Sequence, residues 1–260
     1  MTSQHNKMVV HNKQLLLLGC CLGAASAFGP TFGNGIAGVP VCGSSHAPQN
    51  IVNHTLSAGE THGVLHHFWV TGADAQVGRM WVDYFIDGEA TPSISFQPAM
   101  MCGLAFPERL AASAAAPNKE YAAGALCGKT APSGGWYNTF PVPFYKSVLV
   151  QVRADEAADG PGCFHGYVNV RGTVGLPLAL PGSGVPLPTG ARLWLQRNEM
   201  AARQPLEYVT VAQLAPGQAG MVFLTSFAVE AQPVGGSGAG GGYIEGCWTF
   251  YRQVRLLAHD

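Results

Sequence analysis

Short apolar runs interrupted by Gly and Pro constrain the fold of this chain more than any other feature. Its 260 residues include 34 Gly and 18 Pro, and 47% are hydrophobic. Runs such as 64–71, 80–86 and 147–153 are rich in β-branched and aromatic residues, which is typical of strands bounded by turns. Since no run keeps a helical period over several turns, the pattern predicts an all-β sandwich or barrel.

The remaining segments complete this expected organisation. Further strands are predicted at 92–96, 139–144, 163–172, 192–196, 207–211 and 221–230. Residues 103–135 are rich in Ala and Gly and predict an inserted loop, in which 109–116 is the one plausible helix. Residues 28–56 are rich in small and polar residues and predict an irregular lead-in.

Charge and motifs exclude several classes of function. The formal net charge is −1, with no block of Lys or Arg, which argues against nucleic-acid partners and an anionic membrane surface. The nucleotide-binding, zinc-protease and serine-hydrolase motifs are absent from the sequence. His66 and His67 are expected on opposite faces of a strand, so with His62 they are interpreted as ordinary strand histidines. We expect no metal and no cofactor.

The N-terminus predicts a secretory signal peptide over residues 1–27. Lys7 and Lys13 precede the apolar run 15–22, which is too short to span a bilayer, and small residues lead to a cleavage site after Ala27. The expected location is secreted or lumenal, with no membrane partner once the leader is removed. The Ala-Ser-Ala-Phe junction also resembles bipartite plastid-targeting leaders, so a plastid is the alternative.

Five cysteines follow the leader: Cys42, Cys102, Cys127, Cys163 and Cys247. They allow at most two disulfides and one thiol, and their pairing cannot be read from spacing. Cys102 and Cys127 flank the inserted segment and are the preferred pair. Asn53-His54-Thr55 is a sequon for N-glycosylation at Asn53 in a secreted chain.

Three ordered blocks carry a family resemblance. They are residues 63–71 with 84–89 and 92–94, residues 136–147, and residues 243–251, the last of which reads Tyr-Ile-Glu-Gly-Cys-Trp-Thr-Phe-Tyr. In this order and at this separation they resemble glycoside hydrolase family 172, which acts on difructose anhydrides and arabinofuranosides. The resemblance runs from about Ser57 to Tyr251.

This resemblance implies a double jelly-roll β-sandwich. Residues 57–234 would form the first jelly roll, 235–242 a Gly-rich linker and 243–260 the first strand of the second, in a homo-oligomer whose protomers share active sites. It also implies retaining hydrolysis by two carboxyl groups about 5–5.5 Å apart, with Glu245 as the nucleophile. The family's acid/base Glu, in a Gly-Thr-Gly-Thr-Glu-Asp stretch one hairpin later, is not matched before Asp260. A truncated, inactive or nearly inactive hydrolase-like chain is therefore expected.

Carbohydrate is the expected partner. Trp136, Tyr137 and Trp69 are predicted to contact sugar, although a core position is equally plausible for Trp136 and Tyr137. Asp87-Gly88-Glu89 is interpreted as a hairpin turn rather than a catalytic pair, because Asp-Gly is a preferred turn dipeptide. The alternative function is a non-catalytic carbohydrate-binding or assembly β-sandwich, with a capsid-like assembly protein as a third possibility.

Overall fold

The computed structural model describes residues 31–35, 37–42, 47–72, 77, 80–101, 126–130, 134–154, 163–179, 184–197, 210, 212–218 and 220–222. The chain divides into two compact units, residues 1–228 and 229–260. All described residues belong to the first unit, so the expected linker at 235–242 and the strand that carries Glu245 lie outside the described residues.

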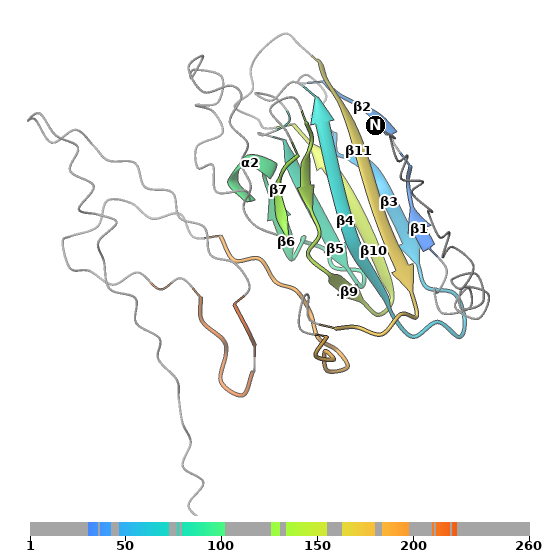
Figure 1. Cartoon of the computed structure of the whole chain (residues 1–260), viewed down its shortest axis with the longest axis vertical. Helices are drawn as coiled ribbons and strands as arrows, with labels where there is room; N and C mark the ends of the chain where they lie inside the picture. The colour runs from blue at the N-terminus through green and yellow to red at the C-terminus, as the bar shows by residue number, and fades with distance from the viewer. Residues whose placement is uncertain are drawn as a thin grey trace, which may run out of the picture. The chain divides into compact units, whose positions relative to one another are not determined.

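Two antiparallel sheets form the described part of the chain (Figure 1). The larger sheet has the order β1-β11-β4-β8-β7, with β2 also paired to β11 and β9 also paired to β4. Its strands are β1 (Thr31–Gly33), β2 (Ala37–Cys42), β4 (Gly63–Gly72), β7 (Cys127–Lys129), β8 (Trp136–Asn138), β9 (Val142–Phe144) and β11 (Cys163–Val174). The smaller sheet has the order β3-β10-β5-β6, comprising β3 (Gln49–Thr55), β10 (Ser147–Arg153), β5 (Trp81–Ile86) and β6 (Ile94–Phe96).

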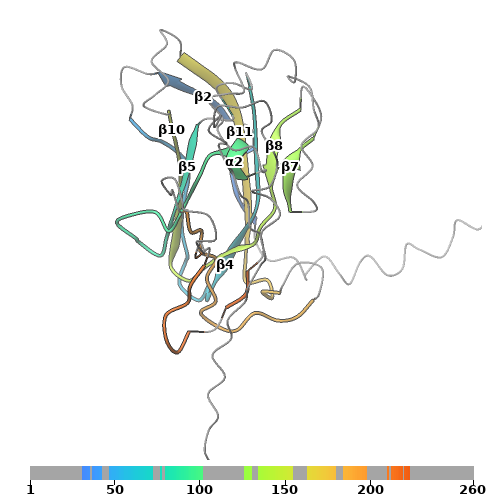
Figure 2. The same ribbon diagram turned by 90° about the vertical axis from the view of Figure 1, so that its left-hand side faces the viewer.

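The sheets lie face to face as two layers, with β5 and β10 in one layer and β4, β8 and β7 in the other (Figure 2). One short helix, α2 (Pro98–Met101), follows β6. The prediction of an all-β sandwich is confirmed. The finer expectation of a jelly roll stays a prediction.

Alternation along the strands builds the core between the layers. Val148, Val150 and Val152 of β10 are fully buried, while the residues between them are partly exposed, which is the period-2 pattern of a half-buried strand. The ring of Phe96 makes edge contacts with Phe68 and Tyr84 at centroid distances of 5.7 and 5.6 Å. Because Phe68 belongs to the larger sheet and the other two rings to the smaller one, these contacts join the layers.

The predicted lead-in at 28–56 is not irregular, since it contains β1, β2 and β3. These strands pair through their backbones with β11 and β10, a non-local interaction that their small and polar side chains do not encode. Pro40 is tolerated in β2 because, among the described strands, β2 pairs with β11 alone and therefore lies at an edge.

The predicted strand at 192–196 is wrong, and the predicted inserted loop at 103–135 contains β7. The predicted helix at 109–116 and most of the predicted strands at 207–211 and 221–230 lie outside the described residues, and the described residues of those two segments, 210, 221 and 222, are not in a strand. The preferred disulfide between Cys102 and Cys127 is also wrong: Cys127 is a buried thiol that donates to the Met101 carbonyl oxygen at 3.7 Å. Among the described residues, no helix is long and apolar enough to cross a bilayer.

Candidate functional site

The Asp87-Gly88 turn after β5 is confirmed. Asp87 and Gly88 have φ angles of 57° and 85°, and Glu89 N donates to Ile86 O at 3.2 Å. Two successive positive φ angles are the signature of the tight turns that favour Asp-Gly.

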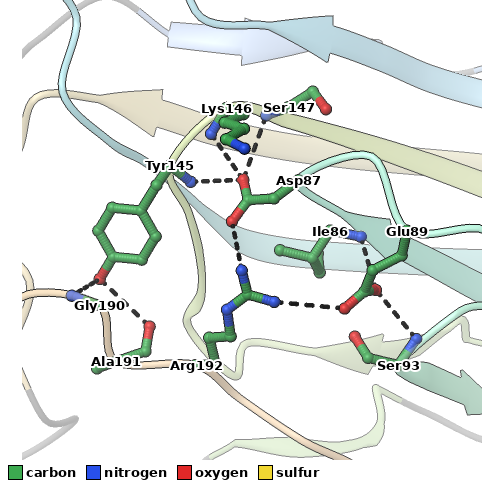
Figure 3. A network of polar contacts seen from close by, with 10 residues as sticks. All are labelled: Ile86, Asp87, Glu89, Ser93, Tyr145, Lys146, Ser147, Gly190, Ala191 and Arg192. Carbon is green, nitrogen blue, oxygen red and sulfur yellow. Dashed lines mark hydrogen bonds and ion pairs between the residues drawn. The ribbon is translucent and has the colours of Figure 1, made fainter.

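The Asp87 carboxylate ties this turn to the segment between β9 and β10 (Figure 3). Its Oδ1 accepts backbone N–H groups from Tyr145 at 2.7 Å, Lys146 at 2.6 Å and Ser147 at 3.3 Å. Its Oδ2 forms an ion pair with Arg192 Nη2 at 3.1 Å. Both oxygens of this buried carboxylate are therefore engaged.

Glu89 makes a second set of contacts beside the first. Its Oε2 accepts the backbone N–H of Ile86 at 3.0 Å and of Ser93 at 3.2 Å, and its Oε1 lies 3.5 Å from Arg192 Nη1. We refer to Asp87, Glu89 and Arg192 as the Asp87 network. The segment carrying Arg192 is also held by Tyr145, whose hydroxyl donates to Ala191 O and accepts from Gly190 N.

The Asp87 network is a structural device. The carboxylates of Asp87 and Glu89 accept backbone N–H groups and pair with one arginine, so their contacts hold the turn against its neighbouring segments. The network brings together the Asp-Gly-Glu block and the Tyr-Lys-Ser block of the family resemblance, which lie 58 residues apart in sequence at Asp87 and Tyr145. The two blocks therefore occur together because their contacts hold the turn after β5 against the segment between β9 and β10.

The predicted sugar-contacting residues fall on two different faces of the larger sheet. Trp69 and Tyr137 are direct cross-strand partners on β4 and β8, and both are partly exposed. They point away from the core, because Phe68 and Val70 on either side of Trp69 are buried in it. Trp136 points the other way and is only 1% exposed within the core. A buried side chain of this kind cannot contact a ligand on the outward face.

Glycine makes room for the Trp69 ring. Gly135 precedes β8, and a Cβ at this position would overlap the Trp69 indole at Cε2 and Nε1. The indole therefore lies across the backbone of Gly135. On its other side, Tyr137 is the cross-strand partner of Gly128 of β7. Because glycine has no side chain, no β-carbon flanks the tyrosine there.

Asn169 is a functional candidate that sequence reasoning missed. It is the cross-strand partner of Trp69 on β11 and faces the same side, because Val168 and Val170 are fully buried in the core. The side chain is 5% exposed, and its Oδ1 is buried without a hydrogen-bond partner in the described part of the structure. Asn169, Trp69 and Tyr137 thus form one row across three strands, which we call the Trp69–Tyr137 surface.

The histidines of β4 are arranged differently from the expectation. The pairing of β11 with β4 is irregular between Arg171 and Gly172, whose partners are His67 and Leu65, so His66 is an extra, bulged residue. Since Leu65 and Phe68 are both in the core, His66 and His67 both lie on the outward side. The prediction that they occupy opposite faces is wrong because it assumed a regular strand.

Partial burial lowers the pKa of both His66 and His67 below the usual value, and the positive charge of Arg171 lowers both further. His62 instead forms two hydrogen bonds, one between Nε2 and Leu176 O at 2.7 Å and one between Nδ1 and Thr61 Oγ1 at 2.9 Å. Within the described ranges, no group of three or more His, Cys, Asp or Glu residues could hold a metal ion.

Two further predicted site residues have different outcomes. Asn53 is an exposed residue of β3, at the edge of the smaller sheet, which is an accessible position for a glycan. Glu245 lies outside the described residues, so its predicted role as nucleophile stays a prediction.

Comparison with known proteins supplies no family. No family model matches the chain, and no characterised protein matches it either.

Proposed function

We propose that this chain is a carbohydrate-binding β-sandwich that binds sugar on the Trp69–Tyr137 surface. The observation that carries the proposal is the direct cross-strand pairing of two partly exposed aromatic residues on one outward sheet face. Sugar rings have apolar C–H faces, and large aromatic side chains offer both apolar area and a polar edge to such ligands.

Polar groups surround the aromatic pair. Thr71 and His67 flank Trp69 on the same face of β4, and the unpartnered Oδ1 of Asn169 is an acceptor next to it. A buried acceptor without a partner is costly, and a ligand hydroxyl or bound water that reaches it would remove that cost. Aromatic rings with acceptors beside them match the mixed character of a sugar.

A binding assay with two tryptophan variants tests this proposal. We expect the full chain to bind at least one polysaccharide in a panel of immobilised plant and microbial glycans. Loss of a stacked aromatic side chain removes about 1.5–3 kcal/mol, so Trp69→Ala should weaken that binding roughly 10- to 100-fold.

Trp194→Ala is the matched control, because Trp194 is 66% exposed in the segment after the sheets and belongs to neither face. It should leave the affinity unchanged. Failure of the chain to bind any glycan, or equal losses in the two variants, would contradict the proposal.

A glycoside hydrolase with Glu245 as nucleophile is the second candidate. It is favoured by one observation, namely that two of the three blocks resembling family 172 meet in the Asp87 network. If Glu245 acts as a nucleophile without an acid/base partner, the rate of hydrolysis should be lower by a factor of about 10²–10⁴ than with such a partner. Turnover of aryl furanosides that Glu245→Gln abolishes would favour the hydrolase over the binding module; turnover that survives this change would exclude Glu245 as nucleophile.

A further inference from the structure

A third aromatic residue lies on the same outward face as the Trp69–Tyr137 surface. Tyr167 of β11 is 55% exposed, and it faces outward together with Asn169 because Val168 between them is fully buried in the core. Its cross-strand partners are Thr71 of β4 and Gly38 of β2. The aromatic residues of this face therefore extend over four neighbouring strands, which pair in the order β2-β11-β4-β8.

The rings of Tyr167 and Trp69 extend in opposite directions across the sheet. A Cβ at Gly38 would lie 3.9 Å from Tyr167 Cε1, so the edge of the tyrosine ring reaches over β2. The Trp69 indole instead lies across the backbone of Gly135, which precedes β8. The two rings therefore lie apart, one on each side of the central pair β11 and β4.

The distance between the two glycines is longer than one sugar ring. Gly135 comes one position before the pair of Trp136 and Val70, so it lies beside Thr71, in the same row as Gly38. Neighbouring strands are about 4.8 Å apart, and three such spacings separate β2 from β8, which makes the row roughly 14 Å long. A ligand that contacts both rings must therefore be an extended molecule of more than one sugar unit.

Polar groups lie between the two rings. Thr71 is partly exposed and is the partner of Tyr167. Asn169, the partner of Trp69, has the buried Oδ1 that lacks a hydrogen-bond partner in the described part of the structure. An aromatic ring at each end with a hydroxyl and an acceptor between them fits a chain of sugars, in which apolar C–H faces alternate with hydroxyl groups.

An open sheet face favours a long ligand over a single sugar. Sites for small molecules are concave and bury most of the ligand surface, whereas a sheet face contacts one side of its ligand. A single sugar would therefore remove little apolar area from water. Affinity on such a face has to be summed over several linked units, each of which raises the effective concentration of the next.

We propose that the Trp69–Tyr137 surface binds the interior of a straight polysaccharide chain, with one sugar unit at Trp69 and Tyr137 and another at Tyr167. Cellulose, xylan, mannan and chitin chains have this extended shape, whereas an amylose chain curves away from a flat surface. The assignment rests on the proposed function, to which it adds the shape of the ligand and a second aromatic subsite.

Calorimetry with oligosaccharides of increasing length tests this assignment on the full chain. The ligands are the di-, tetra- and hexasaccharides of cellulose, xylan, mannan and chitin. At least one series should bind, with the tetrasaccharide roughly tenfold tighter than the disaccharide, as expected for one added ring contact. Maltohexaose is the control ligand because it is a curved chain of the same length as the hexasaccharides. It should bind no more tightly than a disaccharide.

Tyr167→Ala should remove the gain in affinity from disaccharide to tetrasaccharide, whereas Trp69→Ala should weaken binding at every length. If Tyr167 only packs against Gly38 to stabilise the strands, its loss would weaken all lengths equally and the gain would persist. Trp194→Ala, at an exposed tryptophan outside the sheets, should leave the dependence on length unchanged.

Three results would overturn the assignment of a second subsite: affinity that does not rise with chain length, a rise that survives Tyr167→Ala, or maltohexaose that binds as tightly as the straight hexasaccharides. Each of these, seen together with a loss of binding in Trp69→Ala, leaves the proposed function standing. Absence of binding to every oligosaccharide and to the glycan panel overturns both.

Discussion

The Asp87 network and the Trp69–Tyr137 surface differ in how completely their polar groups are satisfied. In the network, Asp87 and Glu89 accept backbone N–H groups and share one arginine, so each carboxylate oxygen has a partner. At the surface, an acceptor of Asn169 is buried without a partner beside partly exposed aromatic rings. A satisfied group stabilises the fold, whereas a buried acceptor without a partner requires an explanation, and the one proposed here is a ligand or a bound water.

This contrast distinguishes residues that a sequence motif suggests as functional from residues that are placed to bind a ligand. Asp87 and Glu89 form an acidic pair of the kind that glycosidases use, yet their contacts commit them to structure. Trp69 belongs to the first block of the family resemblance, whereas Asn169 lies in none of the blocks. Their significance comes only from pairing across three strands.

The largest expected effect is on stability, at Asp87. Asp87→Ala would leave three backbone N–H groups without their acceptor and place alanine at a positive φ. Together these should lower the free energy of unfolding by on the order of 3–5 kcal/mol. Urea unfolding followed by fluorescence measures the change.

Asp87→Asn is the matched control. Asparagine tolerates the positive φ and keeps one oxygen acceptor, so it should lose about half as much stability. If Asp87→Ala costs less than about 1 kcal/mol, the network is not the structural device described here, and the two regions would no longer differ in the stated way.

A smaller effect is expected at Gly135, and it tests the Trp69–Tyr137 surface. Gly135→Ala introduces a methyl group where the Trp69 indole lies, so the ring must move while both aromatic residues remain. Affinity for the bound glycan should fall roughly tenfold, about 1.4 kcal/mol. Unchanged affinity at an unchanged melting temperature would mean that the position of the Trp69 ring does not matter for binding.

The smallest effect is a pH dependence from His66 and His67. Because their pKa is lowered in the fold, the unfolded chain takes up protons more readily than the folded chain around pH 6.5. Stability should therefore be lost as the pH falls from about 6.5 towards the folded pKa, and level off below it. Melting temperatures over this window should show a shallower slope in the His66→Gln/His67→Gln variant; an identical slope would contradict the shift.

The sequence predicted the local features of the fold well. The strands at 63–72, 81–86 and 147–153 and the Asp-Gly turn follow from side-chain alternation and turn chemistry, which are local properties. β1, β2 and β3 were missed because their stability comes from backbone pairing with β11 and β10. Because small and polar side chains do not specify such pairing, the sequence pattern does not predict these strands.

The candidate site could be predicted only in part. Trp69 and Tyr137 were named from residue type, but their pairing depends on the register of β4 and β8. Asn169 is a hundred residues from Trp69 in sequence and became a candidate only through β11. The bulge at His66 reversed an inference from strand alternation, because one extra residue changes which face a side chain takes.

The most direct measurement of the central claim is a sugar titration followed by the indole N–H signals of the five tryptophans in ¹⁵N-labelled protein. The signal that Trp69→Ala removes should shift as the sugar binds. Those of buried Trp136 and exposed Trp194 should stay in place. A shift of the Trp194 signal instead, or binding that leaves the Trp69 signal unmoved, would contradict the assignment of carbohydrate binding to the Trp69–Tyr137 surface.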